Sequence, residues 1–133
     1  MKINLLNFLK GKKKKPTFTL TRNFHKRNFY FVRIVEWGWL DAVNIFVKDH
    51  HRSKIITLDP WAANIFLSAH GTTTVEEYVH YVAGQYGEDI PENLEQTIIF
   101  EMVKLNDLKF ISMIPDKQPP AAEFDKPAFG EEQ

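Results

Sequence analysis

The sequence predicts an α+β domain in which a three-stranded antiparallel meander precedes three helices and a short C-terminal strand. Residues 29–58 hold three short segments rich in aromatic and β-branched side chains, which favour strands. Residues 59–106 hold three segments with apolar residues at helical spacing, and each has start or stop signals. Residues 109–114 are apolar again and predict the final strand. This order is typical of the winged helix-turn-helix type.

The predicted meander uses three strands joined by two connections. Residues 29–35 form the first strand, and residues 37–41 look like a connection with glycine at the bend. Residues 42–48 alternate apolar and polar side chains, as a half-buried strand does. A polar turn at residues 49–52 leads to a third strand at residues 54–58.

The first two helices have clear start and stop signals in the sequence. Asp59 is an N-cap acid and Pro60 occupies the first helical position, so we expect a helix that Gly71 stops. Thr74 and Glu77 have the spacing of a capping box, in which each side chain bonds the backbone of the other residue. The second helix therefore starts at Thr74.

The third helix opens near Pro91 and runs to residue 106. Its acidic residues in the first turn stabilise the helix dipole. Its apolar stripe is made of Leu94, Ile98, Met102 and Leu105.

Charge and proline content divide the 133 residues into a basic arm, a folded domain and a tail. Residues 1–27 hold nine basic and no acidic side chains, so residues 28–133 carry eight basic and seventeen acidic groups, a net charge of −9. We expect residues 1–27 to be a disordered basic arm and residues 115–133 a disordered, Pro-rich acidic tail. The folded domain is then residues 28–114, a normal size for one domain.

Several classes of protein are excluded or disfavoured. The chain has no cysteine, which excludes a disulfide scaffold, a cysteine-ligated metal cluster and a cysteine nucleophile. There is no secretory signal and no apolar run of the ~20 residues that span a membrane, so the cytoplasm is the expected compartment. An alternative for the apolar residues 3–9 and the lysine run behind them is contact with an anionic membrane surface, without stable insertion.

Catalytic signatures are also missing from the sequence. It has no Gly-rich phosphate loop, no nucleophile elbow and no zinc-binding His-Glu-x-x-His motif. His50 and His51 fit a polar turn better than a metal site, and His80 fits a surface position. We therefore expect a protein that is not an enzyme and has no metal or cofactor.

DNA binding is the first alternative that the fold class raises. A recognition helix needs basic and amide side chains toward phosphates and bases, but residues 91–106 carry three glutamates and only Lys104. DNA binding is thus disfavoured, although a winged-helix regulator of DNA or of a protein remains the alternative function.

Residues 28–114 contain a strand that ends in Leu58-Asp59, a helix with Ala62-Ala63, and a helix start from Gly71 to Glu77. This combination of motifs resembles the PqqD-like family. The resemblance implies a small winged-helix peptide chaperone, or recognition element, for ribosomally made peptides that are later modified. A scaffolding or immunity role in peptide modification, with no affinity for a leader, is a third possibility. His70 departs from the pattern, because the family commonly has Asp before this glycine.

The resemblance also implies a mode of binding and a set of partners. A leader peptide would add as a strand along residues 54–58, over a groove shared with the third helix. Glu95 and Glu101 could select a leader that bears Lys or Arg. The partners would be the precursor peptide and a modifying enzyme of the radical-SAM type, with the basic arm contacting either. For the apolar candidates, ordinary core packing is the alternative. The candidate peptide-binding residues are Lys54, Ile55, Ile56, Thr57, Leu58, Leu94, Glu95, Ile98, Glu101 and Met102.

Overall fold

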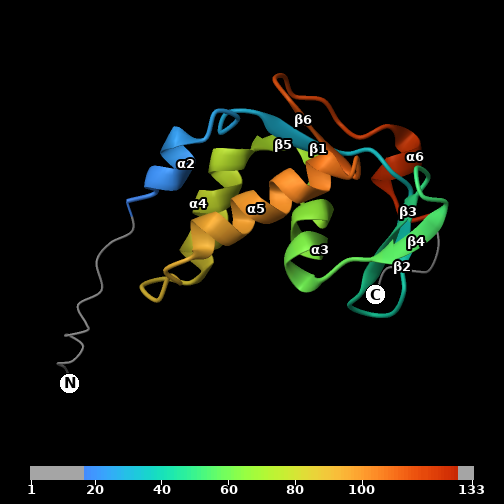
Figure 1. Cartoon of the computed structure of the whole chain (residues 1–133), viewed down its shortest axis with the longest axis horizontal. Coiled ribbons are helices and arrows are strands. Elements are labelled where there is room, and N and C mark those ends of the chain that lie inside the picture. The colour runs from blue at the N-terminus through green and yellow to red at the C-terminus, as the bar shows by residue number, and fades with distance from the viewer. Residues whose placement is uncertain (1–16, 129–133) are drawn as a thin grey trace.

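The computed structural model describes residues 17–128 and shows an α+β protein (Figure 1). Within this part of the chain, six strands form two three-stranded antiparallel sheets, with strand orders β5-β1-β6 and β2-β3-β4. The α+β class is therefore confirmed. No helix of the described residues has the length and apolar character needed to cross a membrane.

The meander is present, but its first strand is not the expected one. It consists of β2 (Trp37–Trp39), β3 (Ile45–Asp49) and β4 (Lys54–Thr57). Residues 37–39, expected as a connection, pair with β3, because the Asp41 carboxylate accepts hydrogen bonds from the N–H groups of Val43 and Asn44 and closes a short loop. Sequential strands joined by such a loop pair readily.

The strand expected first in the meander belongs to the other sheet. β1 (Tyr30–Arg33) is the central strand between β5 (His70–Thr74) and β6 (Ile111–Ile114). β6 agrees with the predicted final strand. β5 was not predicted, since its His-Gly-Thr-Thr-Thr sequence lacks apolar alternation and forms a strand only beside β1.

The three main helices are α3 (Pro60–Leu67), α4 (Val75–Gln85) and α5 (Leu94–Asp107). The Asp59 side chain accepts from the Ala62 N–H at 2.9 Å, and both capping-box bonds between Thr74 and Glu77 are present. The starts of α3 and α4 are thus confirmed. α3 ends earlier than expected, at Leu67, and Gly71 lies within β5 with φ of 78°.

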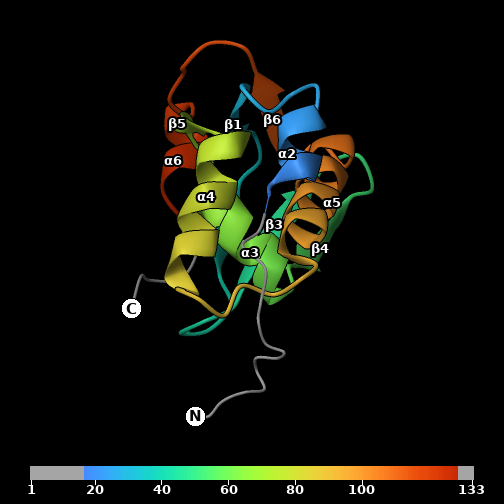
Figure 2. The same ribbon diagram turned by 90° about the vertical axis from the view of Figure 1, so that its left-hand side faces the viewer.

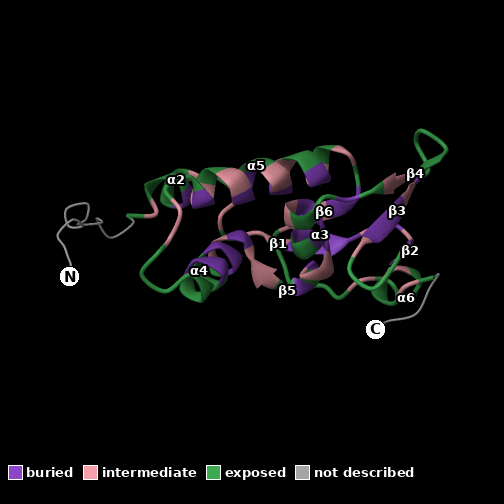
Figure 3. Ribbon diagram, turned by 90° about the horizontal axis from the view of Figure 1, so that it is seen from below, coloured by how far each residue is buried: buried purple, intermediate pink, exposed green. Residues whose placement is uncertain are grey.

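The hydrophobic core lies between the helices and both sheets. Each main helix turns a buried face inward, as Figure 3 shows. The largest fully buried side chains of the core include Phe31 of β1, Phe66 of α3 and Phe110 before β6. α5 contacts α3 and α4, so the core joins elements from the whole described chain.

The end of the basic arm is folded onto the domain. Residues 17–27 include α2 (Thr19–Asn23), which contacts α4 and α5 (Figure 2). The Thr21 N–H donates to the Glu95 carboxylate at 2.8 Å, and the Phe18 ring lies 4.3 Å from that of His80. These contacts differ from the expected disorder, because apolar residues between the charges can enter the core. Residues 1–16 lie outside the described residues.

The C-terminal tail is also docked up to residue 128. It contains the short helix α6 (Ala122–Asp125), whose carbonyls accept hydrogen bonds from Arg33. Farther on, the Ala128 N–H donates to the Trp37 carbonyl at 2.7 Å. The expected disorder of the tail therefore does not describe residues 115–128, while residues 129–133 lie outside the described part.

Candidate binding edge and aromatic pocket

Strand β4 forms one edge of the β2-β3-β4 sheet. The Leu58 N–H donates to the Ile45 carbonyl of β3 at 3.2 Å. Because alternate residues of a strand direct their backbone groups to the same side, those of Lys54 and Ile56 also face β3. The backbone N–H and C=O groups of Ile55 and Thr57 consequently face the free edge.

The other sheet edges in residues 17–128 are each partly covered. At β2, Ala128 donates to the outward carbonyl of Trp37. At β5, the Gln118 N–H donates to the Gly71 carbonyl at 3.0 Å. At β6, the Asn106 side chain accepts from the Met113 N–H at 3.1 Å. β4 is the edge without such a cover among the described residues, and an uncovered edge can pair with another chain.

The side chains of β4 divide into exposed and buried positions. Ile55 is 61% exposed, and Lys54 and Thr57 are exposed as well. Ile56 packs partly buried against the core, and Leu58 is buried in it. Of the predicted strand residues, Ile55 therefore presents the largest apolar surface to a partner.

The candidate residues on α5 do not form the expected groove with β4. Leu94, Ile98 and Met102 are fully buried in the core, on the helix that packs against α3. The alternative of ordinary core packing holds for these three. Their spacing reflects the buried stripe of an amphipathic helix, which is the same pattern that a groove would require.

The two candidate acids on α5 already interact within the chain. The Glu95 carboxylate accepts a hydrogen bond from the Thr21 N–H of α2, and the Glu101 carboxylate lies 3.4 Å from the Lys104 ammonium. Glu101 is mostly buried. Selection of a basic leader by either acid would therefore require it to leave its present partner.

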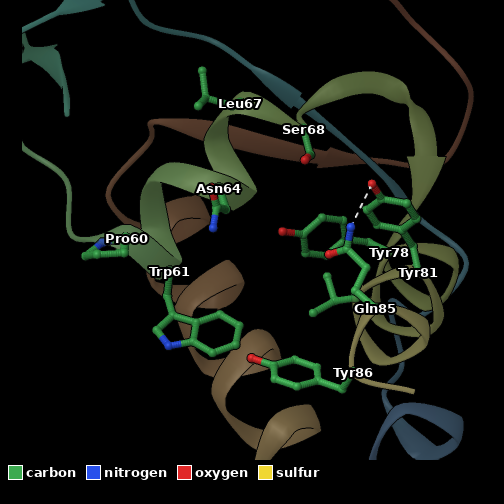
Figure 4. Close-up of a pocket in the computed structure, with 10 residues that line it drawn as sticks. Pro60, Trp61, Asn64, Leu67, Ser68, Tyr78, Tyr81, Gln85 and Tyr86 are labelled. Carbon is green, nitrogen blue, oxygen red and sulfur yellow. Dashed lines mark hydrogen bonds between the residues drawn. The ribbon is translucent and has the colours of Figure 1, made fainter. Parts of the chain in front are cut away.

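A pocket of about 550 Å³ lies between α3 and α4 (Figure 4). Four aromatic side chains and several neutral polar ones surround it, and no charged side chain lines it. Its lining is Pro60, Trp61, Asn64, Leu67 and Ser68 of the α3 region, with Tyr78, Tyr81, Val82, Gln85 and Tyr86 of the α4 region.

The sequence reasoning missed this pocket because its residues come from two helices and share no periodic pattern. The signal available in the sequence was Tyr81, an aromatic residue off the apolar stripe of α4. In the structure it is 63% exposed. Burial raises the pKa of Tyr78, while a hydrogen bond from Ser68 acts in the opposite direction. The Tyr78 phenol therefore stays neutral at physiological pH, and the pocket has no charge of its own.

Within residues 17–128, no group of three or more histidine or carboxylate side chains is placed so that it could hold a metal ion. His50 lies 3.9 Å from Glu36, and His80 contacts Phe18. Both histidines are thus accounted for by surface contacts.

Comparison with protein-family models, curated proteins and solved structures finds no match for this chain.

Proposed function

We propose that this protein is a non-catalytic, PqqD-like winged-helix protein that captures the leader of a ribosomally made precursor peptide and presents it to a modifying enzyme, of the radical-SAM type. The leader adds as a strand along β4. The observation that carries the proposal is the uncovered edge of β4 beside three covered edges in residues 17–128. The motifs shared with PqqD-like proteins support it.

The edge supplies a short but regular set of backbone contacts. Ile55 and Thr57 offer two N–H donors and two C=O acceptors to an added strand. Each such hydrogen bond contributes a net ~0.5–1.5 kcal/mol, and association consumes several kcal/mol of rigid-body entropy. Backbone pairing alone therefore gives weak binding, and apolar leader residues must add contacts to the exposed Ile55 side chain.

The electrostatic balance favours a peptide over nucleic acid. Residues 17–128, which include the docked end of the basic arm, hold eleven basic and fifteen acidic side chains, a net charge of −4. A polyanion would be repelled by this surface. A leader with basic residues would be attracted to it before the strand forms.

Thr57→Pro tests the proposal with little effect on the meander. Proline removes the Thr57 N–H, which faces the free edge, and leaves every hydrogen bond to β3 in place. Thr57→Val keeps the N–H and serves as the matched control. The ligand is the leader of each short open reading frame next to the gene, added to isotope-labelled full-length protein and followed by amide chemical shifts.

We expect wild type and Thr57→Val to show shifts at residues 53–58 with one of these leaders, and Thr57→Pro to bind it about two- to tenfold more weakly, as the loss of one hydrogen bond predicts. Equal binding by Thr57→Pro, or shifts that leave residues 53–58 unchanged, would contradict strand addition. A gel shift with DNA whose affinity survives deletion of residues 1–27 would favour the alternative regulator.

A further inference from the structure

The pocket between α3 and α4 offers hydrogen-bond donors that nothing in the described chain uses. The indole N–H of Trp61 and the amide of Asn64 have no hydrogen-bond partner within residues 17–128, and in Figure 4 both side chains border the cavity. Gln85 donates to the Tyr81 hydroxyl at 3.1 Å across one side of the pocket. Together with the hydroxyls of Ser68, Tyr78 and Tyr86, these groups set the polar chemistry of the lining.

Aromatic rings provide much of the remaining lining, with apolar side chains from Pro60, Leu67 and Val82. The Tyr86 hydroxyl points toward the Trp61 ring, and Tyr78 and Tyr81 lie on the α4 side of the cavity (Figure 4). Aromatic rings offer broad apolar surface at low cost in conformational entropy. The pocket therefore combines flat apolar walls with N–H donors and carries no charge.

We propose that this pocket binds a proline-containing peptide segment in the polyproline II conformation. Such a segment has no internal hydrogen bonds, so its carbonyls need donors, and proline contributes no N–H that would need an acceptor. Trp61 and Asn64 supply the donors, while the aromatic rings supply the surface on which proline rings pack. The neutral lining disfavours phosphate, carboxylate and ammonium ligands, because it offers them no opposite charge.

The size of the cavity agrees with this ligand. A volume of about 550 Å³ is within the range of ordinary ligand pockets. One turn of polyproline II is three residues and roughly 9 Å long, which is a segment that such a pocket can hold. The chain's own Pro119 and Pro120 follow Gln118, whose N–H donates to the Gly71 carbonyl of β5, and neither proline lines the pocket. We therefore assign the bound segment to a partner.

This inference does not depend on strand addition at β4. The pocket lies on α3 and α4, and no β4 residue lines it. A partner peptide could fill the pocket whether or not β4 binds a leader. The Thr57→Pro variant separates the two sites, because it removes an edge donor and leaves the pocket lining unchanged.

The experiment titrates a capped oligoproline of about ten residues, roughly 30 Å long, into isotope-labelled full-length protein. A capped Gly-Ser peptide of equal length is the control ligand. The Trp61 indole N–H signal, assigned by its loss in Trp61→Phe, reports directly on the pocket. Tyr81→Ala removes an exposed pocket ring, and Phe100→Ala on α5 is the matched control, since Phe100 is 62% exposed and lies outside the pocket.

We expect oligoproline, and not the Gly-Ser peptide, to shift the Trp61 indole signal in wild type and Thr57→Pro. Tyr81→Ala should weaken binding by about tenfold, and Phe100→Ala should stay within about twofold of wild type. An unchanged indole signal at millimolar oligoproline overturns the proposal, as does an equal response to the Gly-Ser peptide. Selective binding of a small neutral aromatic compound such as indole, without oligoproline binding, would also overturn it.

Discussion

Replacement of Arg33 by methionine is expected to release the C-terminal tail and strongly destabilise the fold. Arg33 is only 2% exposed, and its guanidinium donates to carbonyls at the ends of two helices. It bonds Phe66 and Leu67 at the end of α3 at 3.2 and 3.1 Å, and Phe124 and Asp125 of α6 at 3.1 and 3.0 Å. Methionine keeps apolar volume but offers none of these donors.

The expected loss is about 3–5 kcal/mol, because carbonyls at the ends of α3 and α6 lose a charged donor, at roughly 1–3 kcal/mol for each one left unsatisfied. A sum over four carbonyls would overestimate it, because Phe124 keeps the Trp37 indole donor at 2.9 Å. The Asp125 side chain is half exposed and lies 3.6 Å from Arg33, so water can replace that partner. Burial lowers the pKa of Arg33 and Asp125 opposes this, which indicates that desolvation already offsets part of the gain.

Urea and thermal unfolding of the full chain measure the loss, and amide signals of residues 122–128 report whether the tail detaches. The midpoint of thermal unfolding should fall by about 10–20 °C. Lys54→Met is the matched control: Lys54 is exposed on β4, so this change should cost under about 1 kcal/mol. A loss within about 1 kcal/mol of wild type for Arg33→Met, with the tail still ordered, would refute this account.

Two further predictions concern β5. Gly71→Ala should cost about 2–4 kcal/mol in urea unfolding, because the new Cβ would lie 1.7 Å from the Gln118 carbonyl oxygen and the backbone φ is 78°. Gly84→Ala on α4, where a Cβ meets nothing within 4 Å, should instead stabilise the fold by up to about 1 kcal/mol. Equal effects of the two substitutions would contradict the close approach at Gly71. Burial, and then the charge of Arg33, lower the pKa of His70 from its usual 6.5, while Asp125 opposes this. The unfolded chain then binds more protons, so wild-type stability should fall as pH drops below about 6.5. His70→Gln should remove that part of the pH dependence and His51→Gln should retain it; identical pH profiles for wild type and His70→Gln would contradict the sign.

The candidate site shows how far local patterns reach. Residues 54–57 form a strand as predicted, because side-chain composition favours extended backbone locally. Whether that strand lies at an edge depends on its neighbours, and the tail covers β2 but not β4. Likewise, the periodicity of α5 predicts an apolar stripe on one face of the helix. Only the packing of α5 against α3 shows that this stripe belongs to the core and does not line a groove.

The starts of α3 and α4 and the position of the last strand were determined by the sequence alone, whereas α5 begins at Leu94 instead of near Pro91. Asp59 with Pro60, and Thr74 with Glu77, act over three residues, so their hydrogen bonds form wherever the helix lies. Tertiary structure decided the partners of β1, which pairs Tyr30 with Thr74 on one side and with Ile114 on the other. It also decided the docking of α2 and α6 and the meeting of α3 and α4 around the aromatic pocket. These pairings depend on contacts between residues far apart in the chain, and no local pattern encodes which distant segment supplies the partner.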